Sequence, residues 1–277
     1  MTVVEQMLAR YPADAASRAL ALREIMQEIA LAGLQRGGFF DSAAFYGGTC
    51  LRIFYGLPRF SEDLDFSLLQ PDTHFSLEPY FKPVQEEFRA FGFDVSLTAK
   101  HKTASSAIES AFLKKTASLY DLTVIGQKTL KIKLEVDADP PLGFKTQERL
   151  LLQPYSFYTK CFALPDLFAG KMHALLYRTW GQRVKGRDWF DFEWYVRQGC
   201  ALNLAHFAER AYQSGDLPTR SVSIPEFNRL LSDRIRELNV RSAKEDIQRF
   251  VPDASALEVW SQTYFQQLAE RIHFVNQ

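Results

Sequence analysis

The sequence predicts an α/β lobe followed by an all-helical lobe. Short alternating runs typical of strands recur up to Gln153, whereas the chain after Pro165 shows only the apolar spacing of helices. Pro154 and Pro165 mark the change. The chain has 277 residues and 47% hydrophobic residues, which suffice for a sizeable core. We therefore expect two domains, residues 1–160 and 161–277, with the helical lobe completing a cleft.

The first lobe is expected to begin with an amphipathic helix over residues 14–35. Apolar residues recur there at helical spacing, and the pattern stops before Gly37-Gly38. The following segments alternate between strand and helix patterns before the run of strands. In order, we expect a strand at 45–46, a helix at 49–55, a strand at 64–69, a helix at 76–91, and strands at 95–97, 108–113, 119–124, 130–136 and 150–152.

The second lobe is expected to contain helices alone. Each segment repeats apolar residues at helical spacing and is separated from the next by breaker or capping residues. The expected helices cover residues 166–180, 187–198, 203–213, 224–238, 242–250 and 256–273.

Composition narrows the class of protein. Lys plus Arg and Asp plus Glu both number 33, so the formal charge is zero and any nucleic-acid site must be a local patch. Three scattered cysteines indicate neither a disulfide framework nor a cysteine metal site. The N-terminal sequence does not have the pattern of a signal peptide, and no apolar run reaches about 18 residues. We expect a cytoplasmic protein with no membrane partner.

Gly47-Gly48-Thr49 is the first candidate binding feature. Glycines adopt backbone conformations closed to other residues and let backbone N–H groups approach a phosphate. Thr49 adds a hydroxyl at the expected start of a helix, where anions are favoured. Taken alone, the same three residues also describe an ordinary turn from strand to helix with an N-cap.

Asp63 and Asp65 form a candidate metal-binding pair. Residues i and i+2 of a strand point to the same side, which brings two like charges together. Divalent cations relieve that repulsion, and two ions about 4 Å apart can clamp the attacking and leaving oxygens of a phosphoryl transfer. Such a pair alone also occurs on solvated strand faces. The preceding glycines favour the functional interpretation.

Glu135 is the candidate third acid. The run from Lys131 to Asp137 alternates strictly, so Lys131, Lys133, Glu135 and Asp137 share one strand face. Glu135 lies inside the expected strand and Asp137 at its end, which favours Glu135. An exposed face with paired charges is the alternative interpretation.

The second lobe begins with a basic stretch. Five basic residues and no acid occur between positions 171 and 187, and a lysine in a cleft could stabilise charge on a triphosphate. The others could bind nucleotide phosphate or an RNA backbone, although a solvated helix end has the same composition. The five are Lys171, Arg178, Arg183, Lys185 and Arg187.

Asp188 and Asp191 follow on a helix rich in aromatic residues. A buried acid needs a partner, and the basic stretch offers several. We expect Asp188 to be the site acid and Asp191 to give structural support. Motifs of P-loop, Rossmann and zinc-protease sites are missing from the sequence, and the five histidines show no metal-ligand spacing.

These motifs together resemble the signature of the AbiEii/AbiGii toxin family, nucleotidyltransferase-like proteins of bacterial toxin–antitoxin and phage-defence systems that include the mycobacterial MenT toxins. The family pattern has Gly-Gly/Ser-Thr/Ser and then Ser-x-Asp-x-Asp-Phe, matched here by 47–49 and 61–66. The later motifs match the strand 132–137, the lysine helix 169–175 and Arg187-Asp188-x-x-Asp191. The first motif is specific, whereas the others are persuasive only by their order.

The resemblance implies a nucleotidyltransferase-fold, mixed-sheet first lobe and Mg²⁺-dependent transfer of a nucleotide from an NTP to RNA, with tRNA as the expected acceptor. It implies two Mg²⁺ ions, replaceable by Mn²⁺, and a cognate antitoxin partner. In some relatives the serine at the Ser61 position is phosphorylated, which inactivates the enzyme. The residues expected to act fall into three overlapping groups. These are catalytic Asp63, Asp65, Glu135, Lys171 and Asp188; nucleotide-binding Gly47, Gly48, Thr49, Ser61, Lys171 and Arg187; and metal-binding Asp63, Asp65 and Glu135.

Two other functions remain open from the sequence. One is transfer of the γ-phosphoryl group from an NTP to a protein serine or a small molecule. The other is a protein of the same fold that binds nucleotide or RNA without turnover, against which the intact set of acids argues.

Overall fold

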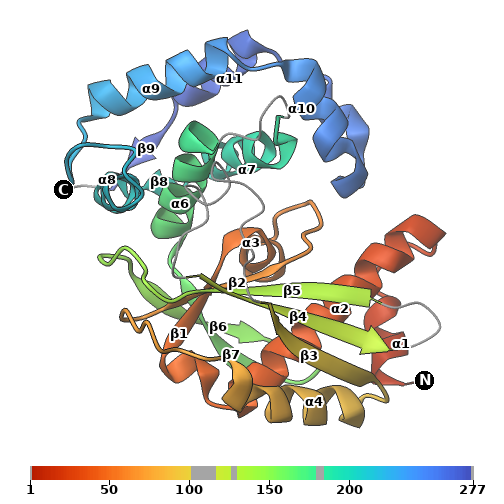
Figure 1. Ribbon diagram of the computed structural model, residues 1–277. Helices are drawn as coiled ribbons and strands as arrows, with labels where there is room; N and C mark the ends of the chain where they lie inside the picture. The colour runs from red at the N-terminus through yellow and green to blue at the C-terminus, as the bar shows by residue number, and fades with distance from the viewer. Residues whose placement is uncertain (1, 101–116, 126–129, 179–183, 276–277) are drawn as a thin grey trace. The chain divides into compact units, whose positions relative to one another are not determined.

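The computed structural model describes residues 2–100, 117–125, 130–178 and 184–275 (Figure 1). The chain divides into two compact units that are not continuous in sequence. Two short segments that precede the helical region in sequence, Leu57–Arg59 and Pro141–Lys145, group with it. Unit 1 comprises Met1–Gly56, Phe60–Pro140 and Thr146–Cys161, and unit 2 comprises Leu57–Arg59, Pro141–Lys145 and Phe162–Gln277.

Unit 1 is built on a mixed sheet, in which the described residues form seven strands in the order β3-β4-β5-β2-β1-β7-β6 (Figure 1). β2 runs parallel to β5 and β1 parallel to β7, while β1–β2, β3–β4 and β4–β5 are antiparallel. This sheet confirms the predicted α/β class. The strands are β1 (Ala43–Tyr46), β2 (Leu64–Leu68), β3 (Asp94–Lys100), β4 (Ala117–Ile125), β5 (Leu130–Asp137), β6 (Thr146–Leu151) and β7 (Phe157–Phe162).

The helices of unit 1 begin and end where local chemistry dictates. The Asp14 side chain caps α2 by accepting a hydrogen bond of 2.9 Å from the Ser17 N–H. α2 packs against α4, and Gly33 lies so close to the Val84 backbone that a side chain would not fit at this crossing. α3 packs against β1, β2 and β6. The helices are α1 (Val3–Leu8), α2 (Ala15–Arg36), α3 (Gly47–Tyr55) and α4 (Phe81–Ala90).

Unit 2 is a bundle of helices with an aromatic core. The Phe168 and Tyr195 rings stack at 4.4 Å between centroids, and the buried Glu193 accepts hydrogen bonds from Trp260 and Tyr264 at 2.6 and 2.7 Å. The elements are α6 (Leu164–Tyr177), α7 (Gly186–Arg197), β8 (Ala201–Leu202), α8 (Leu204–Gln213), α9 (Ile224–Arg236), α10 (Val240–Ile247), α11 (Gln262–Ala269) and β9 (His273–Phe274).

The structure departs from the predicted elements in three places. β7 was not predicted, because its alternation lies between Pro154 and Pro165 and was interpreted as a linker. The helix predicted over 256–273 is shorter in the structure, where α11 covers Gln262–Ala269. It starts at Gln262 because the Ser261 side chain caps its N-terminus. β8 and β9 pair in parallel, so unit 2 is not purely helical. The strand predicted at 108–113 lies outside the described residues.

Among the helices that the structure describes, none combines the length and the apolar character needed to cross a membrane.

Candidate functional site

The glycine turn of unit 1 places the start of α3 directly against Asp65. Tyr46, the last residue of β1, lies opposite Asp65 of β2 in the antiparallel register. Gly47 follows with φ +81°, a conformation that L side chains rarely adopt, and a Cβ at this position would collide with the Asp65 carboxylate. The half-buried Gly48 continues the first turn of α3. A side chain at position 47 would therefore strain the backbone and displace the Asp65 carboxylate from the start of α3.

Thr49 fixes the loop that carries the aspartates. Its side chain is fully buried, and its hydroxyl donates a hydrogen bond to the backbone carbonyl of Asp63. The same loop is held again where the Gln27 side chain donates to the Ser61 carbonyl at 3.2 Å. We expected the Thr49 hydroxyl to contact phosphate. The structure instead uses it to position Asp63, because this residue of the first turn faces the interior.

Asp65 and Glu135 are direct neighbours on parallel strands. They are paired in the β2–β5 register, and Asp63 lies just before β2. The Lys133 ammonium contacts the Glu135 carboxylate at 2.8 Å. Burial alone would lower the pKa of Lys133, but Glu135, Asp63 and Asp65 together raise it. The four charged groups therefore share one local field, and that field is negative enough to stabilise a cation.

The predicted three-acid metal site is not preformed. Among the described residues, no three His, Cys, Asp or Glu side chains converge as a ligand set. Glu135 is engaged by Lys133 instead. Asp63 and Asp65 suit Mg²⁺ nonetheless, because this ion commonly takes one or two carboxylates and completes its shell with water and substrate phosphate oxygens.

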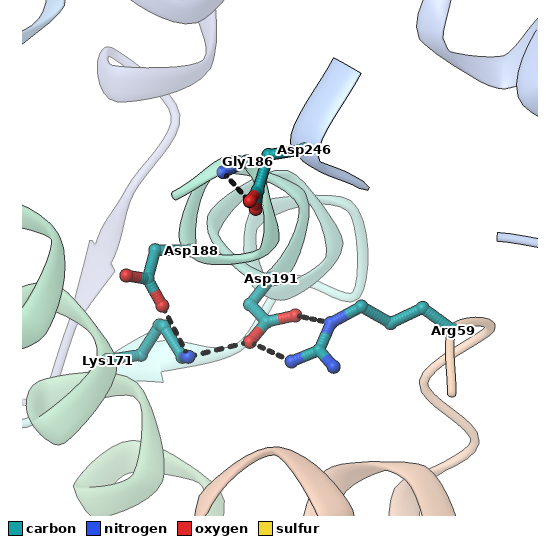
Figure 2. Close-up of polar contacts among 6 residues, drawn as sticks. All are labelled: Arg59, Lys171, Gly186, Asp188, Asp191 and Asp246. Carbon is teal, nitrogen blue, oxygen red and sulfur yellow. Dashed lines mark hydrogen bonds and ion pairs between the residues drawn. The ribbon is translucent and has the colours of Figure 1, made fainter. Parts of the chain in front are cut away.

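A second charged cluster lies within unit 2, where α6 meets α7 (Figure 2). Lys171 of α6 contacts the carboxylates of Asp188 and Asp191, each at 2.8 Å. Arg59 contacts both oxygens of Asp191, with its Nε and Nη2 each donating at 2.6 Å. The structure thus brings together the predicted Lys171 and Asp188, and it adds Arg59, which the sequence analysis did not consider.

The two aspartates of α7 differ in exposure and partners. The Asp191 side chain is completely buried between two cations, whereas that of Asp188 is 10% exposed and has Lys171 as its ion-pair partner. Burial alone would raise the pKa of Asp188, but the charge and hydrogen bond of Lys171 outweigh it and lower the pKa. The two aspartates therefore differ in how far their charge is accessible, and the assignment of Asp188 as the site acid stays a prediction.

Three cations of the basic stretch, Lys171, Lys185 and Arg178, act on the charge of Asp188. Burial is the main cause that lowers the pKa of Lys185 to about 8; Asp188 opposes this shift, and nearby Arg178, Arg187 and Lys171 add to it. Arg187, which we expected at the nucleotide, places its guanidinium 4.4 Å from the centre of the Phe250 ring. Arg183, the remaining member of the stretch, lies outside the described residues.

The start of α7 is fixed from α10. The Gly186 N–H donates to the Asp246 carboxylate at 3.0 Å, a favourable place for an anion at a helix N-terminus (Figure 2). The carbonyl of Ala243 approaches Gly186 so closely that a Cβ would not fit. This contact and that of Arg59 with Asp191 were not predictable, because partners 60 or more residues apart leave no local pattern. The one usable signal for Lys133 was its place beside Glu135 on the alternating strand.

Comparisons with known proteins agree with the fold. The structure resembles that of JHP933 from Helicobacter pylori, with a TM-score of 0.56, 17% sequence identity, and 93% of each chain covered. It also resembles a nucleotidyltransferase candidate from H. pylori, with a TM-score of 0.50, 18% identity, and 90% of this chain and 92% of that chain covered. A search of curated proteins finds no match.

Family membership rests on a match that covers most of the sequence. The model of the family described as "Nucleotidyl transferase AbiEii toxin, Type IV TA system" matches residues 29–271, which include every candidate residue named above. Such a family implies an antitoxin as partner. The chain belongs to the AbiEii nucleotidyltransferase toxin family of type IV toxin–antitoxin systems.

Proposed function

We propose that the protein transfers a nucleotide from an NTP to an RNA acceptor, with tRNA as the expected acceptor and Mg²⁺ as the required ion. The observation that carries this proposal is the contact between the Gly47 turn and Asp65. It makes the N-terminus of a nine-residue helix, which favours anions, a neighbour of a carboxylate that can hold a cation. A cation held by Asp65 would offset the charge of a phosphate bound at the helix N-terminus.

In this proposal the acids and the glycine turn of unit 1 have different roles. Asp63 and Asp65 would hold Mg²⁺, which when bound neutralises charge on the phosphates. The N–H groups of Gly48 and Thr49 would bind β- and γ-phosphate oxygens at the start of α3. Glu135 would assist the metal site or accept the proton of the attacking hydroxyl, and Ser61 would lie at the nucleotide. The acceptor hydroxyl attacks the α-phosphorus in line, and pyrophosphate leaves.

Unit 2 supplies cations for phosphate. Lys171, with Arg187 and Lys185, has the chemistry to bind the triphosphate or an RNA backbone, and Asp188 orients Lys171 through the contact at 2.8 Å. The geometry supports this assignment because Lys171 is 15% exposed and held between two carboxylates, so its ammonium has a defined position.

The test is incubation of the full chain with α-labelled NTPs, Mg²⁺ and total tRNA. We expect label to enter RNA with at least one NTP, and Asp65→Asn to abolish the incorporation. Glu62→Gln is the matched control, since Glu62 is a nearby acid whose carboxylate contacts Arg23 at 3.1 Å. No label in any macromolecule, while NTP binding is intact, would refute the transferase function. Label transferred from γ-labelled NTP alone would favour phosphotransfer.

A further inference from the structure

The cluster around Lys171 contains a contact that no feature of the proposed reaction requires. Arg59 is almost completely buried, with a side chain 3% exposed, and both oxygens of the Asp191 carboxylate contact its guanidinium. Arginine binds a carboxylate in this bidentate way through a rigid planar fork, which lysine cannot reproduce. The buried Arg59 therefore binds Asp191 specifically, and Asp191 also contacts Lys171 (Figure 2).

Arg59 influences Lys171 because both cations contact the same oxygen of Asp191. Asp191 Oδ2 accepts from Arg59 at 2.6 Å and contacts the Lys171 ammonium at 2.8 Å. Without Arg59, the whole charge of a fully buried carboxylate would act on Lys171 alone, in surroundings where charge interactions are strong. Arg59 compensates that charge. Lys171 is then oriented by Asp191 while its ammonium remains available for other oxygens on the side of Asp188.

We infer that Arg59 is a positioning residue, which acts through Asp191 on Lys171 and thereby sets the affinity of the protein for the phosphates of its substrate. The inference rests on the proposed phosphate-binding role of Lys171. Arg59 itself touches no substrate. Its loss should weaken phosphate binding only while Lys171 is present, and that conditional effect separates positioning from a general contribution to stability.

The experiment measures binding of inorganic triphosphate to the full chain by titration calorimetry. We expect Lys171→Met to remove most of the affinity and Arg59→Met to weaken binding about tenfold, with Arg59→Lys in between. In the Lys171→Met background, Arg59→Met should have no further effect. Arg10→Met is the matched control, since Arg10 contacts the buried Glu28 of unit 1 at 3.1 Å, and it should bind like the wild type.

A second variant covers the case in which Arg59→Met does not fold. Arg59→Met combined with Asp191→Asn removes both charges of the buried pair, which is often tolerated where removal of one is not. Because no uncompensated charge at position 191 then acts on Lys171, and Asp188 still contacts it at 2.8 Å, we expect triphosphate affinity within about threefold of the wild type. An affinity about tenfold or more below that of the wild type would overturn the inference.

The outcomes distinguish the inference from the function on which it rests. If the wild type binds no triphosphate, or Lys171→Met binds as well as the wild type, the phosphate-binding role of Lys171 fails and the inference fails with it. If Lys171→Met loses binding but Arg59→Met, folded by circular dichroism, binds like the wild type, the inference alone is overturned.

Discussion

The two charged regions of this molecule are built on opposite principles. In unit 1 the acids Asp63, Asp65 and Glu135 are all partly exposed, and their contacts are separate: the Gly47 turn approaches Asp65, the Thr49 hydroxyl donates to the Asp63 carbonyl, and Lys133 contacts Glu135. In unit 2 the cluster of Arg59, Lys171 and Asp191 is buried, and its members hold one another through ion pairs of 2.6 to 2.8 Å. A partly exposed acidic site can exchange ligands. A buried and internally compensated cluster orients its own members, and this difference predicts separate effects on activity and stability.

The largest effect is expected at Asp65. Asp65→Asn should reduce nucleotide transfer by about 10³-fold or more, because a bound metal contributes several kcal/mol to catalysis. The free energy of unfolding should change by less than about 1 kcal/mol, since the side chain is partly exposed. Transfer rates with α-labelled NTP and urea unfolding measure the two quantities. A large loss of stability would show that Asp65 is structural.

The converse pattern is expected at Asp191. Asp191→Asn leaves Arg59 buried without its anion, which should lower the free energy of unfolding by about 3–5 kcal/mol. Asp188→Asn should cost clearly less, because Asp188 is 10% exposed and shares Lys171 with Asp191. Urea unfolding of both variants provides the comparison. Equal losses would contradict the different roles assigned to the two aspartates.

A glycine pair isolates the contact between the turn and Asp65. Gly47 and Gly92 have nearly the same φ, +81° and +82°, but a Cβ on Gly92 would meet nothing within 4 Å. Gly92→Ala should therefore cost only the backbone strain of about 1–2 kcal/mol. Gly47→Ala should cost more and should also reduce transfer, because the new methyl group displaces the Asp65 carboxylate. Identical behaviour of the two variants in urea unfolding and transfer assays would show that this contact has no role.

The smallest effect concerns pH. Lys185 has a pKa lowered to about 8, so its positive charge is lost in the folded protein as pH rises through about 8. Triphosphate affinity should fall about threefold to tenfold between pH 7 and 9, beyond the change seen in Lys185→Arg, which stays charged. The unfolded chain binds more protons in this range, so the contribution of Lys185 to stability rises with pH. Identical pH profiles of wild type and Lys185→Arg would exclude Lys185 from the binding site.

The elements were predictable where local signals are strong. The spacing of apolar residues and the glycines located α2 to within one residue at each end. The position of Ser261 as a cap within the predicted 256–273 helix was missed, because a capping serine differs little from a serine inside a helix until the backbone conformation is known. β7 was missed for a related reason, since its alternation is short and bounded by prolines.

The candidate site was predictable as a set of residues but not as a set of contacts. The order of motifs selected Asp63, Asp65, Lys171 and Asp188, and the family match includes them all. The contact that the Thr49 hydroxyl makes was not predictable, because a hydroxyl at a helix start can face either a ligand or the interior. Only packing decides which way it faces, and here α3 turns the hydroxyl toward the Asp63 carbonyl.

By itself the sequence determined the α/β class, the glycine turn and the charged motifs, because periodicity, glycine conformation and residue chemistry are local properties. The tertiary structure alone decided which charges meet. Asp191 is compensated by Arg59, which lies 132 residues away in sequence, and Glu135 contacts Lys133 while its strand places it beside Asp65. A charged side chain is placed by the balance between its desolvation and its partners, and that balance exists only once distant segments have packed together.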